Sequence, residues 1–306
     1  MTTYEGRPLA RPDEHIEDQG LAFDLGTLFG RRHLLRAVGL GGAALAGLAA
    51  CGTSTGDGTA QSGAAPSSAA PSSAAQGSTT AETVEIPDET AGPYPGDGSN
   101  GPNVLTQSGI VRADIRSSFG GATQTAEGVA LTIELTIVDL AGGGTPFAGT
   151  AVYVWHCDRA GRYSLYSQPI TDQNYLRGVQ IADAAGTVRF TSIFPACYSG
   201  RWPHIHFEVY RDQTAITAAT NAIATSQVAL PKAACDTVYA TSGYEASVTN
   251  LAQVSLARDN VFGDDSAAHQ LGTVTGSADA GYTVALTVPV DTRTAPTGGG
   301  APPGSR

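Results

Sequence analysis

Three stretches of the chain alternate apolar and polar residues with a period of two, as a strand with one buried face does. They are residues 129–137, 188–191 and 282–288. Ala151 to Cys157 is apolar on both faces, which predicts a central strand. Turn sequences such as residues 158–161 follow or separate these runs. The pattern predicts an all-β fold with a β-sandwich core, long functional loops and a few short helices.

Helical periodicity is scarce in the same part of the chain. We expect short helices within Asn221–Leu230 and Tyr244–Ala257. The strand-rich region runs from residue 84 to residue 291, which predicts one domain long enough to bury a sizeable core.

A further alternating run places two histidines on one side of a predicted strand at residues 204–210. Ile205, Phe207 and Val209 point to one face, so His204 and His206 point to the other. A His-x-His pair on one face of a strand can grip a metal ion through both imidazoles.

Two tyrosines lie close to this pair in the sequence. Tyr163 follows the turn at residues 158–161, and Tyr198 comes shortly before His204 and His206. The four rings can converge on one ion as two phenolates and two imidazoles of a non-haem Fe(III) centre. Two phenolates and a hydroxide would neutralise the three charges of Fe(III), and hard anionic oxygen donors favour the ferric state. A tyrosine has a pKa of about 10 in water, and a trivalent ion beside it forces deprotonation.

The N-terminal 51 residues have the order of an export signal. Gly30–Leu35 contains a twin-arginine pair, and the uncharged run Ala37–Ala50 is short for a membrane span. Leu48–Cys51 is similar to a lipobox, the site at which a lipoprotein is cleaved and acylated. Residues 1–51 are thus a predicted twin-arginine signal peptide, and the mature chain is a predicted extracytoplasmic lipoprotein of the cell membrane, anchored at Cys51. A short buried helix with a stray cysteine is the alternative.

Low-complexity segments flank the predicted domain. Residues 52–83 consist of Ser, Ala, Gly, Thr and Pro with almost no large apolar side chain, which predicts a flexible linker. Residues 292–306 have the same character and are a predicted disordered tail.

The charge balance excludes one class of partner. The chain has 17 Lys and Arg residues against 28 Asp and Glu residues, a net charge of −11, with no basic cluster beyond the N-terminus. This argues against nucleic acid as a partner. The charge balance does not decide the oligomeric state, and a homo-oligomer remains one of the alternatives.

Three cysteines remain inside the predicted domain. Outside the cytoplasm one disulfide among Cys157, Cys197 and Cys235 is plausible, and one thiol would be left over. The sequence leaves all three pairings open, with Cys197–Cys235 preferred. A cysteine nucleophile at Cys157 beside His156 lacks any oxyanion-hole motif, so the structural role is favoured.

The strings WHCDRAGRYS, NYLRGVQIADAAGTVRF and PACYSGRWPHIH resemble the intradiol ring-cleavage dioxygenases, and in particular a secreted, lipoprotein-like branch. Upstream, Thr90–Tyr94 resembles the family's segment near the substrate mouth. The resemblance covers most of Val84 to Val290. It implies an Fe(III)-dependent enzyme that uses O₂ to cleave a catechol-type ring between its two hydroxylated carbons, giving a muconate-type diacid.

The resemblance also implies residue roles. Tyr163 and His204 correspond to the equatorial ligands of the metal, and Tyr198 and His206 to the axial ones. Tyr198 is then the natural acceptor for a proton of the catechol. A second set of residues would act around the substrate.

Arg201 matches the family arginine that lies against the bound ring, where it would stabilise developing negative charge. Gln227 matches a glutamine near the oxygen pocket, although a longer insert precedes it here. The chain departs from the family at Ala196, where a glycine is usual, so the loop before Tyr198 is expected to be set slightly differently.

Two other functions stay open on the residues alone. His156 with His204 and His206 would make a three-histidine zinc or copper site. A lipid anchor and a long tether would equally suit a non-enzymatic, surface-anchored binding sandwich. Of the two tryptophans, Trp202 is the one expected to line the site. Arg177 is expected either to orient a substrate carboxylate or to form a structural ion pair.

Overall fold

The computed structural model describes residues 3–4, 7–8 and 84–298. Near the N-terminus, β1 (Thr3–Tyr4) and β2 (Arg7–Pro8) form a short antiparallel pair. The predicted twin-arginine motif, the lipobox at Cys51 and the linker at residues 52–83 lie outside the described residues.

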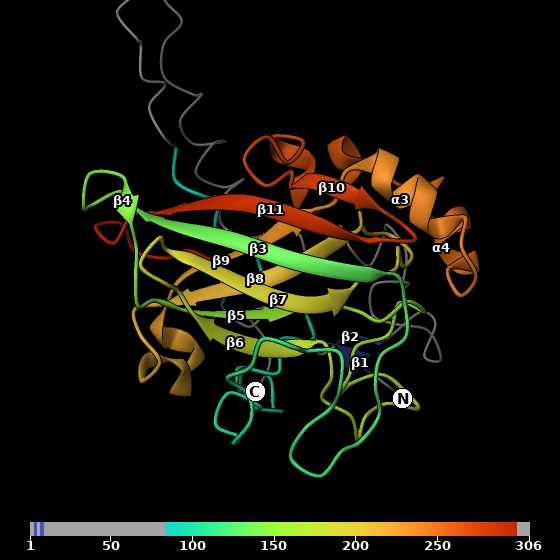
Figure 1. The fold of residues 1–306 in the computed structure, drawn as a ribbon, viewed down its shortest axis with the longest axis horizontal. Helices are drawn as coiled ribbons and strands as arrows, with labels where there is room; N and C mark the ends of the chain where they lie inside the picture. Colours follow the sequence, from blue (N-terminus) through green and yellow to red (C-terminus); the bar gives the residue numbers. More distant parts are fainter. Residues whose placement is uncertain (1–2, 5–6, 9–83, 299–306) are drawn as a thin grey trace, which may run out of the picture. The chain divides into compact units, whose positions relative to one another are not determined.

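Two β-sheets packed face to face form the domain (Figure 1). The first sheet has the order β10-β11-β3-β4, with β7 also paired to β3. Its strands are β3 (Ala130–Asp139), β4 (Thr145–Pro146), β7 (Thr187–Ile193), β10 (Thr273–Ser277) and β11 (Gly281–Val290). The second sheet has the order β6-β5-β8-β9, made of β5 (Ala151–Trp155), β6 (Arg177–Ile181), β8 (His204–Tyr210) and β9 (Ala222–Ala229). The predicted all-β sandwich is confirmed.

The main core fills the space between the sheets. Alternate residues of β3, from Leu131 to Ile137, are buried there. From the second sheet, Val152 and Val154 of β5 enter the same cluster. Ile205, Phe207 and Val209 of β8 meet them, so the predicted apolar face of this strand is the one that faces the other sheet.

Register places four chemically important side chains in one row across the second sheet. Trp155 of β5 pairs with Arg177 of β6 and with His206 of β8, and His206 pairs with Gln227 of β9. Directly paired residues point to the same side of a sheet. The row therefore lies on the face turned away from the other sheet, called the outer face below.

Among the described residues the helices are few and short, and the two α-helices found there lie side by side at one end of the sheets (Figure 1). They are α3 (Lys232–Tyr239) and α4 (Glu245–Leu251). Two 3₁₀ turns precede β9, η2 (Ala215–Thr217) and η3 (Ala219–Asn221), and two follow α4, η4 (Leu256–Arg258) and η5 (Phe262–Asp264). Among the described residues, no helix has the length and apolar character needed to cross a bilayer.

The helix expected within Tyr244–Ala257 is present as α4, but the one expected within Asn221–Leu230 is wrong. That stretch is strand β9. Its backbone N–H and C=O groups find their hydrogen-bond partners in β8 rather than within a helix of their own. Helix α3 follows Pro231 and was not predicted. Its buried residues, Ala234, Cys235, Val238 and Tyr239, do recur at helical spacing.

The preferred disulfide between Cys197 and Cys235 is not formed, and both are buried thiols. Cys197 Sγ donates to the Arg201 carbonyl, and Cys235 Sγ lies 4.0 Å from the Leu230 carbonyl. Burial raises the pKa of Cys197 to about 12 and raises that of Cys235 further. Because disulfide chemistry requires a thiolate, these surroundings disfavour it.

The chain beyond β11 turns back onto the start of the domain. Thr294 Oγ1 donates to Glu85 Oε1 over 2.9 Å, and the Thr297 N–H donates to Asp88 Oδ2 over 2.7 Å. The first part of the segment assigned from sequence to a tail, up to residue 298, thus contacts the N-terminal edge of the domain. Residues 299–306 lie outside the described residues.

Candidate metal centre

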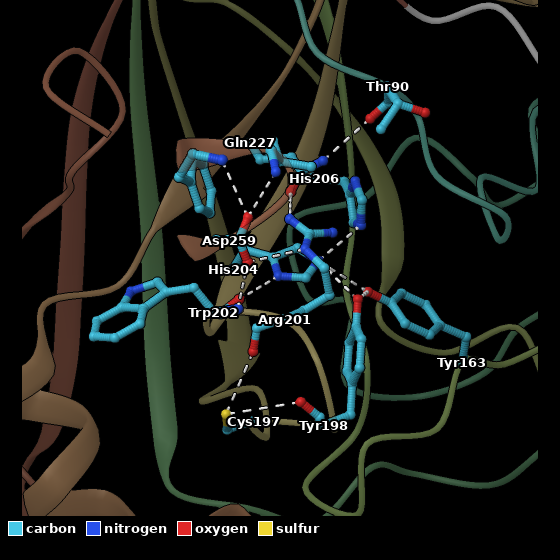
Figure 2. Close-up of polar contacts among 12 residues, drawn as sticks. Thr90, Tyr163, Cys197, Tyr198, Arg201, Trp202, His204, His206, Gln227 and Asp259 are labelled. Atoms are coloured by element: carbon cyan, nitrogen blue, oxygen red, sulfur yellow. Dashed lines mark hydrogen bonds and ion pairs between the residues drawn. The ribbon is translucent and has the colours of Figure 1, made fainter. Parts of the chain in front are cut away.

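Strand β8 presents His204 and His206 side by side on the outer face (Figure 2). Both imidazoles are buried, and their Nε2 atoms are 3.1 Å apart. His204 Nδ1 lies 2.5 Å from the Trp202 carbonyl oxygen. A carbonyl only accepts, so Nδ1 carries the proton and Nε2 keeps its lone pair for another partner.

Burial lowers the pKa of both histidines, the charge of Arg201 lowers both further, and His204 adds to the lowering at His206. Both rings are therefore neutral near pH 7, which is the form that binds metal ions. His206 stacks on Trp155 with ring centroids 4.8 Å apart and planes at 4°. A Cβ atom at Gly92 would lie 3.2 Å from His206 Cε1, so the backbone of that segment covers the ring directly.

The turn at residues 158–161 and the loop after it bring Tyr163 to the same point. Asp158 Oδ1 accepts the N–H groups of Ala160 and Arg162, and Gly161 has a φ of +82° that favours glycine. The Tyr163 N–H donates to Ser167 Oγ. The tyrosine is buried, with its hydroxyl directed at the histidines.

Tyr198 approaches from the loop between β7 and β8, and it is only half-buried. Its Oη atom lies 3.1 Å from His204 Nε2 and 3.5 Å from Tyr163 Oη. Tyr163 Oη in turn lies 3.4 Å from His204 Nε2. Four donor atoms, two phenolic oxygens and two imidazole nitrogens, thus surround one point.

This spacing suits a shared metal ion. Ligand atoms bound about 2 Å from one ion at roughly right angles or more lie about 3 Å apart, close to the separations found here. His206 Nδ1 is buried without a hydrogen-bond partner in the structure, so the ring is placed by packing and by what its Nε2 faces. Within the described ranges no three His, Cys, Asp or Glu side chains gather where they could hold a metal. The two tyrosines are therefore essential to this candidate centre.

Arg201 and Gln227 lie beside the four rings. Arg201 Nη2 donates to Gln227 Oε1 over 2.7 Å, and Gln227 Nε2 donates to the Thr90 carbonyl over 3.1 Å. Both side chains are buried. The insert before Gln227 forms η2 and η3, and the register of β9 against β8 shifts only between Val209 and Tyr210, so Gln227 still pairs with His206. The structure brings both residues to the site expected from the sequence.

Asp259 is a site residue that the sequence did not suggest. Its Oδ2 atom accepts from Arg201 Nε at 3.1 Å and from the Trp202 N–H at 2.6 Å. Burial alone raises the pKa of Asp259, but the Arg201 charge and the backbone donors outweigh it and leave the pKa below its usual value. The carboxylate is therefore ionised next to the guanidinium. It stands in a polar loop with no motif, so only the fold reveals its contact.

His156 does not join the centre. Its Nε2 lies 2.7 Å from Ser192 Oγ and its Nδ1 lies 2.8 Å from the Cys157 carbonyl, so both ring nitrogens are used elsewhere. It follows Trp155, whose side chain points to the outer face, and successive strand residues point to opposite faces. This arrangement argues against the three-histidine site.

The expectation for the tryptophans is wrong. Trp202 belongs to the main core and donates from Nε1 to the Leu230 carbonyl. Trp155 is the one at the centre, stacked on His206, because the register of β5 against β8 pairs these two residues. Its Nε1 atom is buried without a hydrogen-bond partner in the structure.

Arg177 binds the backbone of the segment at Tyr94 and Pro95, which covers the outer face of the second sheet. Its guanidinium donates to the carbonyl oxygens of Tyr94 and Pro95, to Ser164, and to Tyr153 Oη. It is therefore structural through hydrogen bonds rather than through the ion pair considered from sequence. The Tyr94 ring that it places lies 5.0 Å from the Tyr163 ring.

Comparison with known proteins agrees with this architecture. The sequence profile of the dioxygenase family matches residues 100–224. A chlorocatechol 1,2-dioxygenase of Rhodococcus opacus is 40% identical over 55 residues, which is 18% of this chain and 21% of that protein. The match thus spans about a fifth of the relative's length. An intradiol ring-cleavage dioxygenase of Tetranychus urticae has the same fold, with a TM-score of 0.55 and 22% identity over 69% of this chain and 97% of that one.

The profile match and the local identity agree with the resemblance stated from the sequence strings, which is confirmed. The structural comparison adds that the fold is that of an intradiol ring-cleavage dioxygenase.

Proposed function

We propose that the protein is a non-haem Fe(III)-dependent dioxygenase that cleaves catechol-type rings between the two hydroxylated carbons, giving a muconate-type diacid. The observation that carries the proposal is the convergence of Tyr163, Tyr198, His204 and His206. His204 Nε2 lies 3.1–3.4 Å from a donor atom of each of the other three rings, and the two phenolic oxygens are 3.5 Å apart. Two phenolates offer the hard anionic oxygens that Fe(III) prefers, and two neutral imidazoles complete the donor set. A surface-anchored binding sandwich would have no use for such a set.

The four rings would hold the iron, and the bound Fe(III) would supply chelation of both catechol oxygens and activation of the ring towards O₂. Tyr198 is the more exposed of the two phenols, so its Oη is the atom placed to receive a proton from an entering catechol hydroxyl. Tyr163 is buried and stays in place. The two tyrosines thus have different tasks because their burial differs.

Arg201 places a positive charge beside the four rings and, unlike Tyr198, takes no part in proton transfer. Its buried guanidinium would stabilise negative charge that develops on the substrate, and the low dielectric around it makes that stabilisation stronger than in water. Gln227 holds one side of the guanidinium through Nη2. The segment carrying Gly92 and Tyr94 covers the His206 and Tyr163 side of the site.

The test is the visible absorption spectrum of the purified chain loaded with Fe(III), before and after catechol is added without oxygen. A tyrosinate-to-iron band that shifts on catechol addition supports the proposal, and admission of O₂ should then yield the diacid. Tyr163→Phe should lose the band, while Tyr282→Phe, on β11 of the other sheet, should keep it. A fully iron-loaded chain without colour would refute the proposal.

The cellular location is a second part of the proposal. The order of twin arginines, uncharged run and lipobox supports export through the twin-arginine route and a lipid anchor at Cys51. This route carries folded proteins, which suits a domain that takes up its metal before export. Cys51→Ala should move the protein from the membrane fraction to the soluble fraction of cells, and an unchanged distribution would rule out the anchor.

A further inference from the structure

Asp259 divides its two oxygens between two tasks. Oδ1 accepts the backbone N–H groups of Val261 and Phe262, at 2.9 Å and 3.1 Å, and so shapes its own turn. Oδ2 accepts from Arg201 Nε and from the Trp202 N–H. The carboxylate is completely buried, in a segment beyond the residues that the family profile matches. The first oxygen serves the fold of the loop, and the second serves the arginine.

Arg201 is held from three directions by residues distant in the sequence. Asp259 binds Nε and Gln227 binds Nη2. The Phe262 ring lies under the guanidinium, with Arg201 Cζ 5.9 Å from the ring centroid. An arginine side chain has many rotamers, so a fixed position requires contacts that exclude the others.

The same turn supplies two of these contacts. Oδ1 of Asp259 accepts from the Phe262 N–H and so fixes the backbone that carries this ring. Oδ2 of Asp259 binds the Arg201 guanidinium (Figure 2), which lies over the Phe262 ring. Phe262 also lies near His204, with ring centroids 6.5 Å apart. The loop therefore connects the position of the guanidinium with the position of the metal-facing imidazole.

We infer that Asp259 is a positioning residue for the proposed reaction, which holds the Arg201 guanidinium in the orientation that faces the substrate. The inference rests on the proposed function and concerns a residue that does not itself touch substrate. The ion pair is buried on both sides, so removal of the carboxylate takes away the buried counter-charge and one of the contacts that fix the orientation of the guanidinium.

Asparagine at this position separates the two tasks. In Asp259→Asn the amide oxygen can remain at the Oδ1 position and keep the turn, while the amide nitrogen at the Oδ2 position faces two N–H donors. The variant therefore disturbs the arginine and spares the loop. Asp212→Asn is the matched control, because Asp212 accepts the backbone N–H groups of Thr214 and Ala215 in a similar turn without an arginine.

The experiment is a double-mutant cycle on the iron-loaded full chain with catechol and O₂. Asp259→Asn should lower kcat about 10- to 100-fold, as loss of a supporting partner typically does, while the iron content and the visible band persist. Asp212→Asn should turn over normally. In an Arg201→Gln background, Asp259→Asn should change kcat by less than about twofold, because it acts only through the arginine.

Two outcomes overturn the inference while the proposed function stands, namely normal kcat in Asp259→Asn, or losses that multiply in the double variant. If the asparagine variant is insoluble, Asp259→Ser replaces it in both backgrounds, since a serine hydroxyl can still accept a turn N–H. A wild-type chain that is colourless and inactive with iron would instead overturn the proposed function, and this inference with it.

Discussion

The two faces of strand β8 are equally buried and do different things. All residues from His204 to Tyr210 are buried. Ile205, Phe207 and Val209 face the first sheet and belong to the main hydrophobic core. The residues between them, His204, His206, Glu208 and Tyr210, carry polar groups into an equally dry environment on the outer face.

The two faces of β8 contribute to the free energy of folding with opposite sign. Apolar side chains on the inner face gain free energy from burial alone. On the outer face, His206 Nδ1, Trp155 Nε1 and Glu208 Oε1 are buried without hydrogen-bond partners in the structure, and each such group costs about 1–3 kcal/mol. Two of these three atoms belong to the stacked pair at the candidate metal centre, and unsatisfied groups of this kind are found at functional sites. Apolar burial on the inner face thus offsets the cost of the buried polar groups that the outer face carries at the candidate metal centre.

The largest expected effect comes from the outer face. His206→Ala should abolish both iron binding and activity, because it removes one of four donors and the ring that stacks on Trp155. Iron content and the visible band measure the result. His269→Ala, an exposed histidine far along the chain, should keep both. An active, iron-loaded His206→Ala protein would remove this residue from the ligand set.

The neighbouring residue tests the inner face. Phe207→Ala should lower the free energy of unfolding by about 3–5 kcal/mol, through lost apolar burial and the cavity left behind. Urea unfolding measures this, and the visible band of the folded fraction should be unchanged. Loss of the band in a chain that still unfolds at the wild-type midpoint would show that the two faces are not separable.

A buried histidine outside the candidate centre links stability to pH. Burial lowers the pKa of His156 to about 4 in the folded chain. In the unfolded chain the histidine has a pKa of about 6.5 and so binds a proton more readily. The contribution of neutral His156 to the free energy of unfolding is therefore fully present above pH about 6.5 and is lost as the pH falls towards about 4. His156→Gln should flatten this part of the curve of unfolding free energy against pH. An equally steep curve in the variant would assign the effect to other groups.

The smallest effect is expected outside both faces. Arg189 Nε and Glu134 Oε2 are 2.7 Å apart on the first sheet, with 63% and 28% of these side chains exposed. Arg189→Gln should cost less than about 1 kcal/mol, because water and salt screen such a pair. Iron binding and kcat should match the wild type. A loss of activity here would mean that the first sheet contributes to the site in a way its contacts do not reveal.

Sequence patterns succeeded where the information is local. Alternation of apolar and polar residues predicted β3, β7, β8 and β11, and the doubly apolar run predicted β5 as a central strand. The same alternation placed both histidines of β8 on one face. These results follow from the geometry of a strand, in which a residue's side is decided by its parity alone.

Patterns failed where pairing or distant packing decides. The stretch from Asn221 to Leu230 is a strand because β8 offers it a partner, not because of its own composition. The choice between Trp155 and Trp202 depended on the register of β5 against β8, which no short window contains. Asp259 reaches Arg201 across 58 positions of the chain.

By itself the sequence determined strands β3, β5, β7, β8 and β11, the buried face of β8, and the four ring-bearing residues that were expected to meet. These properties depend on residues a few positions apart. The tertiary structure decided that Gln227 stands beside His206, that Asp259 holds Arg201, and that Cys197 and Cys235 remain thiols. These residues are far apart in the sequence and are brought together by strand register and by the path of the chain. Their contacts therefore stabilise the protein only after the sheets have packed.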